Sequence, residues 1–142
     1  MDRHSTDSDR LLALVEIPKG SRNKYEYDEA SEHVILDRFL SSSTVYPVDY
    51  GFLIGHRGED GDPLDCLVCV PVRDPGWSEV ADLEDLPAQL LLEVEHFFSV
   101  YKDLEHKEVE TDGWRPLAEA EAIIEQARVR EVELKARGGP GV

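Results

Sequence analysis

Hydrophobic and polar positions in the first half of the chain recur at the short intervals typical of β-strands. Residues 24–27 alternate strictly, which places Lys24 and Glu26 on one side of a strand and two tyrosines on the other. The run 64–72 is mostly apolar and is expected to form the most buried strand. Further strands are predicted at 11–17, 33–38 and 51–54.

The second half of the chain changes to helical spacing. A first helix is expected to begin near Pro87 with Asp85 as its cap. Its apolar positions share one face: Leu90, Val94, Phe97, Phe98 and Tyr101. A second helix follows Trp114, and its inward positions are Ala120, Ile123, Ile124, Ala127, Glu131 and Leu134. Strands followed by helices predict an α+β fold, in which a small antiparallel sheet or barrel packs against two helices.

The length of 142 residues predicts a single domain, with residues 1–10 and 137–142 as loose tails. The formal net charge of −16 argues against a nucleic-acid partner, because phosphate backbones are bound by clustered Lys and Arg. No apolar run is long enough to span a membrane, and the polar N-terminus is unlike a signal peptide. The composition therefore predicts a cytoplasmic protein.

Two cysteines, Cys66 and Cys69, have C-x-x-C spacing. On a strand this offset places the two thiols on opposite faces. The chain has no further cysteine to complete a four-thiolate zinc site, and no helix follows directly as a thioredoxin-like motif requires. We interpret both residues as structural.

The segment 59–65, with sequence EDGDPLD, carries the strongest chemical signal. Gly61 permits tight backbone geometry, Pro63 prevents a helix, and crowded carboxylates repel one another unless cations neutralise them. A calcium loop of the EF-hand type does not fit, because Leu64, Asp65 and Pro71 stand where a ligand, the turn glycine and the closing Glu are needed. The remaining alternatives are a site for a hard divalent cation and an acidic surface turn.

At this point the sequence resembles the family I soluble inorganic pyrophosphatases. The segment 60–66 fits the signature of that family throughout, and the resemblance extends from Val15 to Arg128. The other matching blocks are 15–27, 36–38, 46–52, 96–98 and 101–104.

The resemblance implies a role for each matching position. Mg²⁺, with Mn²⁺ as a substitute, would be bound by Asp60, Asp65, Glu16 and Glu26. Asp62 would take a proton from the attacking water. Phosphate oxygens would be held by Lys24, Arg38, Tyr50, Tyr101 and Lys102, with Tyr46 in support. The implied substrate is pyrophosphate, and the implied assembly is a homo-oligomer.

The resemblance is interrupted after Leu67. In the family, a further hairpin with a second acidic cluster and a phosphate-binding lysine follows, and roughly thirty residues of that kind are missing here, several strands' worth. Downstream carboxylates could substitute for the missing ligands: Asp74, Glu79, Asp82, Glu84 and Asp85. Two hypotheses remain: a Mg²⁺-dependent pyrophosphatase with impaired turnover, and a catalytically silent relative that binds metal and phosphate. An acidic protein-interaction domain has less support, because the polar residues match a site and not a patch.

Overall fold

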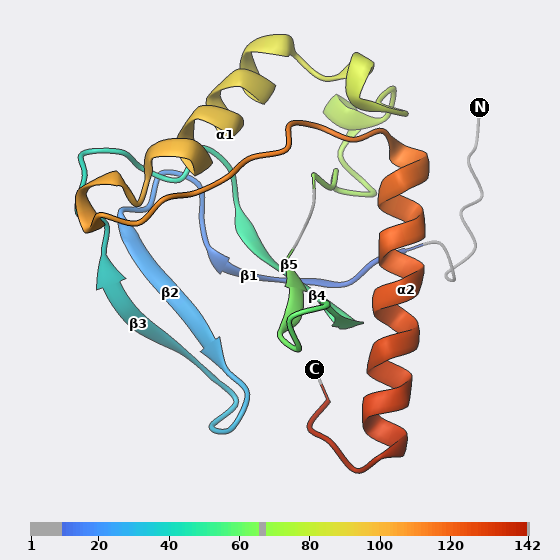
Figure 1. Cartoon of the computed structure of the whole chain (residues 1–142). Helices are drawn as coiled ribbons and strands as arrows, with labels where there is room; N and C mark the ends of the chain where they lie inside the picture. The colour runs from blue at the N-terminus through green and yellow to red at the C-terminus, as the bar shows by residue number, and fades with distance from the viewer. Residues whose placement is uncertain (1–9, 66–67, 142) are drawn as a thin grey trace.

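Antiparallel strands precede two α-helices in the computed structural model, which describes residues 10–65 and 68–141 (Figure 1). The strands are β1 (Ala13–Ile17), β2 (Asn23–Asp28), β3 (His33–Phe39), β4 (Tyr50–Arg57) and β5 (Pro63–Asp65). The helices are α1 (Ala88–Val100) and α2 (Leu117–Ala136), with short 3₁₀ segments η2 (Pro75–Trp77), η3 (Leu83–Asp85) and η4 (Asp103–Glu105). The predicted α+β order of strands and then helices is confirmed.

The strands form two antiparallel sheets, one with the order β1-β4-β5 and one with the pair β2-β3. Within the described residues these sheets do not close into a barrel. Gly51 is required where β1 and β4 pair, because a Cβ atom there would lie 1.8 Å from the carbonyl oxygen of Leu14. The close approach of the two backbones therefore excludes any other residue at this position.

The main hydrophobic core lies where α1 packs onto the strands. Ile17, Leu40, Tyr46 and Phe97 are each at most 3% exposed, and the ring centroids of Tyr46 and Phe97 are 4.6 Å apart. Val94 is also buried, so the apolar face predicted for α1 is the face that it buries. This aromatic core sits directly beneath the candidate site, because further tyrosines of that site pack against it.

Helix α2 covers β4 (Figure 1). It buries only Ala127 and Glu131, and the Glu131 carboxylate pairs with the buried Arg57 at the end of β4. The carbonyl oxygen of Pro140 also accepts a hydrogen bond from Arg57 at 3.1 Å, so the segment predicted as a loose tail contacts the body of the protein.

Two predictions about where elements begin or end are wrong. The strand predicted for 64–72 ends at Asp65, and Val68 and Val72 are 44% and 60% exposed. An apolar run becomes a strand only when a neighbouring strand pairs with it, and Pro71 has no N–H to donate. Cys69 is exposed outside any strand, and Cys66 lies outside the described residues.

The second wrong prediction concerns the cap of α1, which begins after Pro87 without a side-chain cap. Asp85 instead closes a capping box with Asp82 at η3, where its carboxylate accepts from the N–H groups of Ala81 and Asp82.

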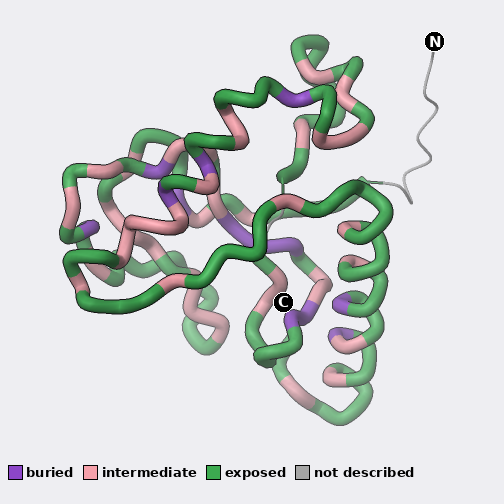
Figure 2. The backbone as a smooth tube through the Cα atoms, turned by 45° about the horizontal axis from the view of Figure 1, so that its top comes forward, coloured by how far each residue is buried: buried purple, intermediate pink, exposed green. Residues whose placement is uncertain are grey.

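Apolar side chains remain exposed on the hairpin β2-β3. Val34, Ile35, Leu36 and Phe39 are 45–64% exposed. Figure 2 shows buried backbone only in short stretches separated by exposed ones. Among the described residues, neither helix has the length and apolar character needed to cross a bilayer.

Candidate active site

A β-bulge places Glu16 between the two sheets. Val15 pairs with Gly51 and Ile17 with Tyr50, so Glu16 is the extra residue of β1. Its Oε2 accepts a hydrogen bond of 2.6 Å from the N–H of Tyr27 on β2. A bulge redirects a side chain, and here it joins the carboxylate of one sheet to the backbone of the other.

A second bulge lies on β3 and gathers four charged side chains. Lys24 pairs with Arg38 and Tyr25 with Leu36, which leaves Asp37 without a residue opposite. The carboxylate of Asp37 lies 2.6 Å from Nη1 of Arg38 and 3.6 Å from Nζ of Lys24. Nζ of Lys24 also pairs with Glu26, as their shared face predicts.

Arg38 connects this hairpin to the end of α1. Its Nε and Nη2 donate to the two carboxylate oxygens of Glu105 in η4, at 2.7 and 3.2 Å. The hydrogen bond from Arg38 lowers the pKa of Glu105, and the bond to Glu105 raises the pKa of Arg38. Nearby, Nζ of Lys102 lies 5.1 Å from the ring centroid of Tyr101.

Sequence reasoning missed Asp37 and Glu105 as members of this group. Asp37 adjoins Arg38 in a matching block, but strict alternation would place the two side chains on opposite faces. Glu105 lies 67 residues from its partner, and only proximity to Lys102 in the sequence could have pointed to it.

Three tyrosines line the site and extend into the core. Tyr46 and Tyr50 have ring centroids 5.7 Å apart, and Tyr101 lies 6.5 Å from Tyr46. Burial raises the pKa of both Tyr46 and Tyr50, and the neighbouring charge of Asp65 raises that of Tyr50 further. The hydroxyl groups therefore stay protonated, and Tyr50 donates a hydrogen bond to Asp65.

Asp65 is the last residue of the acidic loop, which comprises residues 59–65, and it lies next to both sheets. It ends β5, opposite Phe52 of β4, and the residue is exposed. Loss of hydration raises the pKa of Asp65, and the charges of Asp60 and Asp62 raise it further, against the opposing effect of Tyr50.

Burial and neighbouring carboxylates also shift the pKa of Glu16. Burial raises the pKa of Glu16, the N–H of Tyr27 opposes this, and the charges of Asp65 and Glu26 add to the rise. The structure therefore brings Glu16, Glu26 and Asp65 into one electrostatic group, together with Lys24, whose charge acts on Glu16 and Asp65.

Asp60 is held within its own loop. Its Oδ1 accepts from the N–H of Asp62 at 3.0 Å, the N–H of Gly58 donates to the Asp62 carbonyl at 2.8 Å, and Gly61 takes a φ of +88°. Across residues 10–65 and 68–141, no group of three acidic, histidine or cysteine side chains forms a ready-made metal cage. Mg²⁺ usually retains several waters and takes only one or two carboxylates, so the donors present fit that cation.

The model of the inorganic pyrophosphatase family matches this chain at residues 13–69 and 66–131. This chain belongs to that family. The inorganic pyrophosphatase of Methanosarcina mazei is 41% identical over 155 residues, covering 86% of this chain and 92% of the relative. That of Streptomyces coelicolor is 41% identical over 159 residues, covering 88% and 96%. The crystal structure of inorganic pyrophosphatase from Thermus thermophilus is similar with a TM-score of 0.80 and 30% identity, covering 88% of this chain and 93% of that one.

The comparisons also locate a gap in this family member. The two matched segments meet at residues 66–69. The alignment with the Methanosarcina mazei relative has 155 positions, but 86% of 142 residues supplies only about 122 of them, so about 33 positions have no residue here. The interruption inferred after Leu67, a residue outside the described part of the chain, agrees with this.

Two carboxylates downstream of the gap accept hydrogen bonds from backbone N–H groups of this pyrophosphatase-family chain. Asp74 accepts from the N–H of Gly76 at 2.8 Å, and Asp82 accepts from the N–H groups of Leu83 and Leu117 at 2.8 and 3.0 Å. These hydrogen bonds assign Asp74 and Asp82 to the turns that they cap.

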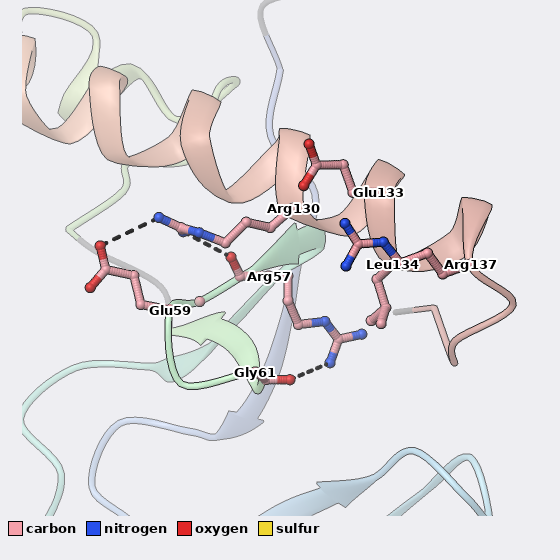
Figure 3. Close-up of a pocket in the computed structure, with 8 residues that line it drawn as sticks. Arg57, Glu59, Gly61, Arg130, Glu133, Leu134 and Arg137 are labelled. Atoms are coloured by element: carbon pink, nitrogen blue, oxygen red, sulfur yellow. Dashed lines mark hydrogen bonds and ion pairs between the residues drawn. The ribbon is translucent and has the colours of Figure 1, made fainter.

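An open hollow of about 240 Å³ lies over the β2-β3 hairpin and is lined by Glu26, Tyr27, Asp28, Ile35 and Asp37. A separate pocket of about 260 Å³ lies between α2 and the acidic loop (Figure 3). The first hollow adjoins the charged group around Lys24, and the second borders the loop that carries Asp60.

Proposed function

We propose that this chain binds inorganic pyrophosphate and hydrolyses it to two phosphates with Mg²⁺, for which Mn²⁺ can substitute. The observation that carries this proposal is the group formed by Glu16, Glu26, Asp65 and Lys24, because the charges of Asp65 and Glu26 raise the pKa of Glu16 while the charge of Lys24 lowers it. Such a group supports a divalent cation better than a solvated surface turn does. The family to which the chain belongs supports the reaction.

In this proposal Asp60 and Asp65 bind a pair of Mg²⁺ ions, and Glu16 and Glu26 hold further metal, directly or through water. Bound Mg²⁺ supplies a lower pKa for coordinated water and neutralises charge on phosphate oxygens. The hydrogen bond from Tyr50 orients the Asp65 carboxylate. Asp62 is exposed beside these ligands and takes the proton of the attacking water.

Cationic side chains hold the phosphate oxygens. Glu105 and Asp37 use three of the five N–H groups of Arg38, which leaves two for a phosphate. Lys24 and Lys102 act as point charges on either side, and the hydroxyl groups of the site tyrosines donate further hydrogen bonds.

We also propose that turnover is lower than in relatives with the complete segment. About 33 aligned positions are missing next to Asp65, and the loss of a single electrostatic stabiliser costs roughly 10²–10³ in rate. A cytoplasmic location and a homo-oligomeric assembly stay predictions.

The test is a phosphate-release assay with pyrophosphate and Mg²⁺ on the wild type, Asp65→Asn and the control Glu121→Gln, whose residue is exposed on α2. We expect release by the wild type and the control that is abolished by EDTA and by Asp65→Asn. A further variant receives the segment of the Methanosarcina mazei relative that is missing here, and it should release phosphate faster.

Metal-dependent binding of pyrophosphate without any phosphate release would instead indicate the catalytically silent relative. Tight binding of pyrophosphate in EDTA would contradict a metal-dependent site, because a chain with net charge −16 should repel the bare anion.

A further inference from the structure

Arg57 is buried at the end of β4, and every one of its side-chain donors is used. Its residue is 4% exposed. Nε donates to Glu131 of α2 at 2.9 Å, and Nη1 and Nη2 donate to the two oxygens of Glu29 in the β2-β3 turn at 2.9 and 3.4 Å. Nη1 also donates to the carbonyl of Gly61, and Nη2 to that of Pro140, both at 3.1 Å. One guanidinium thus joins β4 to four other segments.

The contact with Gly61 is the one that reaches the candidate site. Gly61 lies between Asp60 and Asp62, and its carbonyl oxygen points toward the Arg57 guanidinium, from which it accepts a hydrogen bond (Figure 3). Arg130 of α2 also contacts the acidic loop and Arg57 itself. Its guanidinium donates to the Arg57 carbonyl at 3.2 Å and to Glu59 at 3.4 Å. Two arginines therefore form hydrogen bonds with the acidic loop.

Stability alone does not account for this arrangement. Removing a buried arginine and carboxylate from water is costly, and well-packed apolar residues in their place are often as stable or more stable. Glu131 is 1% exposed, so the pair bears this cost almost in full. An apolar pair could join α2 to β4 equally well, but it could not hold the carbonyl of Gly61.

We propose that Arg57 is a positioning residue for metal binding, which fixes the backbone of the 58–62 loop and thereby sets the affinity of Asp60 and its neighbours for a divalent cation. This inference rests on the proposed function, since it assumes that the loop binds metal. Residues that orient metal ligands from outside the ligand set change affinity by about 10–100-fold when they are replaced.

The test compares the wild type with the double variant Arg57→Met and Glu131→Leu, which replaces the buried pair with apolar side chains and whose folding is checked by its melting temperature. Arg128→Gln serves as a control, because Arg128 is exposed on α2 and its ion pair in the described part of the chain is with Glu125. Three quantities are measured: the melting temperature, Mn²⁺ affinity by electron paramagnetic resonance, and hydrogen exchange of the loop amides.

We expect the double variant to melt within a few degrees of the wild type, to bind Mn²⁺ at least tenfold more weakly, and to exchange its Gly61 and Asp62 amides faster. The Arg57→Lys variant should bind Mn²⁺ more tightly than the double variant but more weakly than the wild type. The reason is that one ammonium group cannot replace five directed donors. Unchanged affinity and exchange in a folded double variant would overturn the inference while the proposed function stands. A wild type that binds no Mn²⁺ would overturn both, because the inference assumes metal binding by the loop, and the exchange data would then report only a structural contact.

Discussion

Without metal, the Asp65→Asn variant should be more stable than the wild type. With metal bound, it should be less stable than the wild type. The asparagine side chain keeps an oxygen that can accept from Tyr50, but the substitution removes a charge that repels Asp60 and Asp62. The raised pKa of Asp65 shows that the folded state disfavours its ionised form. The same charge attracts a cation, so the two effects of the substitution have opposite signs.

The expected magnitudes follow from the chain length. For 142 residues the entropy of unfolding is about 300 cal/mol/K, so each kcal/mol shifts the melting temperature by about 3 °C. Because Asp65 is exposed, screening limits the gain without metal to about 0.5 kcal/mol, or about 2 °C. Metal at 100 times its dissociation constant stabilises by about 2.7 kcal/mol, or about 9 °C, and a tenfold weaker affinity halves this.

The assay is thermal unfolding followed by circular dichroism, in EDTA and in Mn²⁺, between pH 4 and pH 8. A carboxyl with a raised folded pKa contributes stability below its unfolded value, about 3.9, and loses that contribution as the pH rises through the folded value. The advantage of Asp65→Asn in EDTA should therefore be present at pH 7 and vanish toward pH 4. A variant that melts below the wild type in EDTA at pH 7, or a metal shift equal to that of the wild type, would refute this reasoning.

Three further predictions concern the pairing of β1 with β4 and the anchoring of Arg38. Gly51→Ala should destabilise the fold by about 3 kcal/mol, because its Cβ would meet the Leu14 carbonyl at 1.8 Å, and melting within 2 °C of the wild type would contradict this. Arg38→Lys should raise the KM for pyrophosphate about tenfold in the phosphate-release assay, because an ammonium lacks the guanidinium fork; an unchanged KM would remove Arg38 from the site. The pKa of Glu105, measured by nuclear magnetic resonance, should lie below the usual value for glutamate and rise in Arg38→Lys, whereas an unchanged titration would show that the ion pair is absent in solution.

The sequence by itself determined the features that depend on local periodicity. Strict alternation placed Lys24 and Glu26 on one side of β2, where they form an ion pair. The apolar stripe of α1 identified Val94 and Phe97 as buried. These predictions are confirmed because the spacing of side chains within one strand or helix is fixed by its backbone geometry. The match of ordered motifs likewise identified the family, and it located the gap.

The tertiary structure decided the features that depend on partners far away in the chain. Two bulges interrupt the alternation at Glu16 and Asp37, and they turn both carboxylates toward the site, because each strand must fit its neighbour. The same cause ended β5 at Asp65. Helical spacing placed Glu131 on the inward face of α2, but it did not indicate its partner Arg57, 74 residues away. Register, strand ends and buried ion pairs are properties of two segments at once, so neither segment specifies them alone.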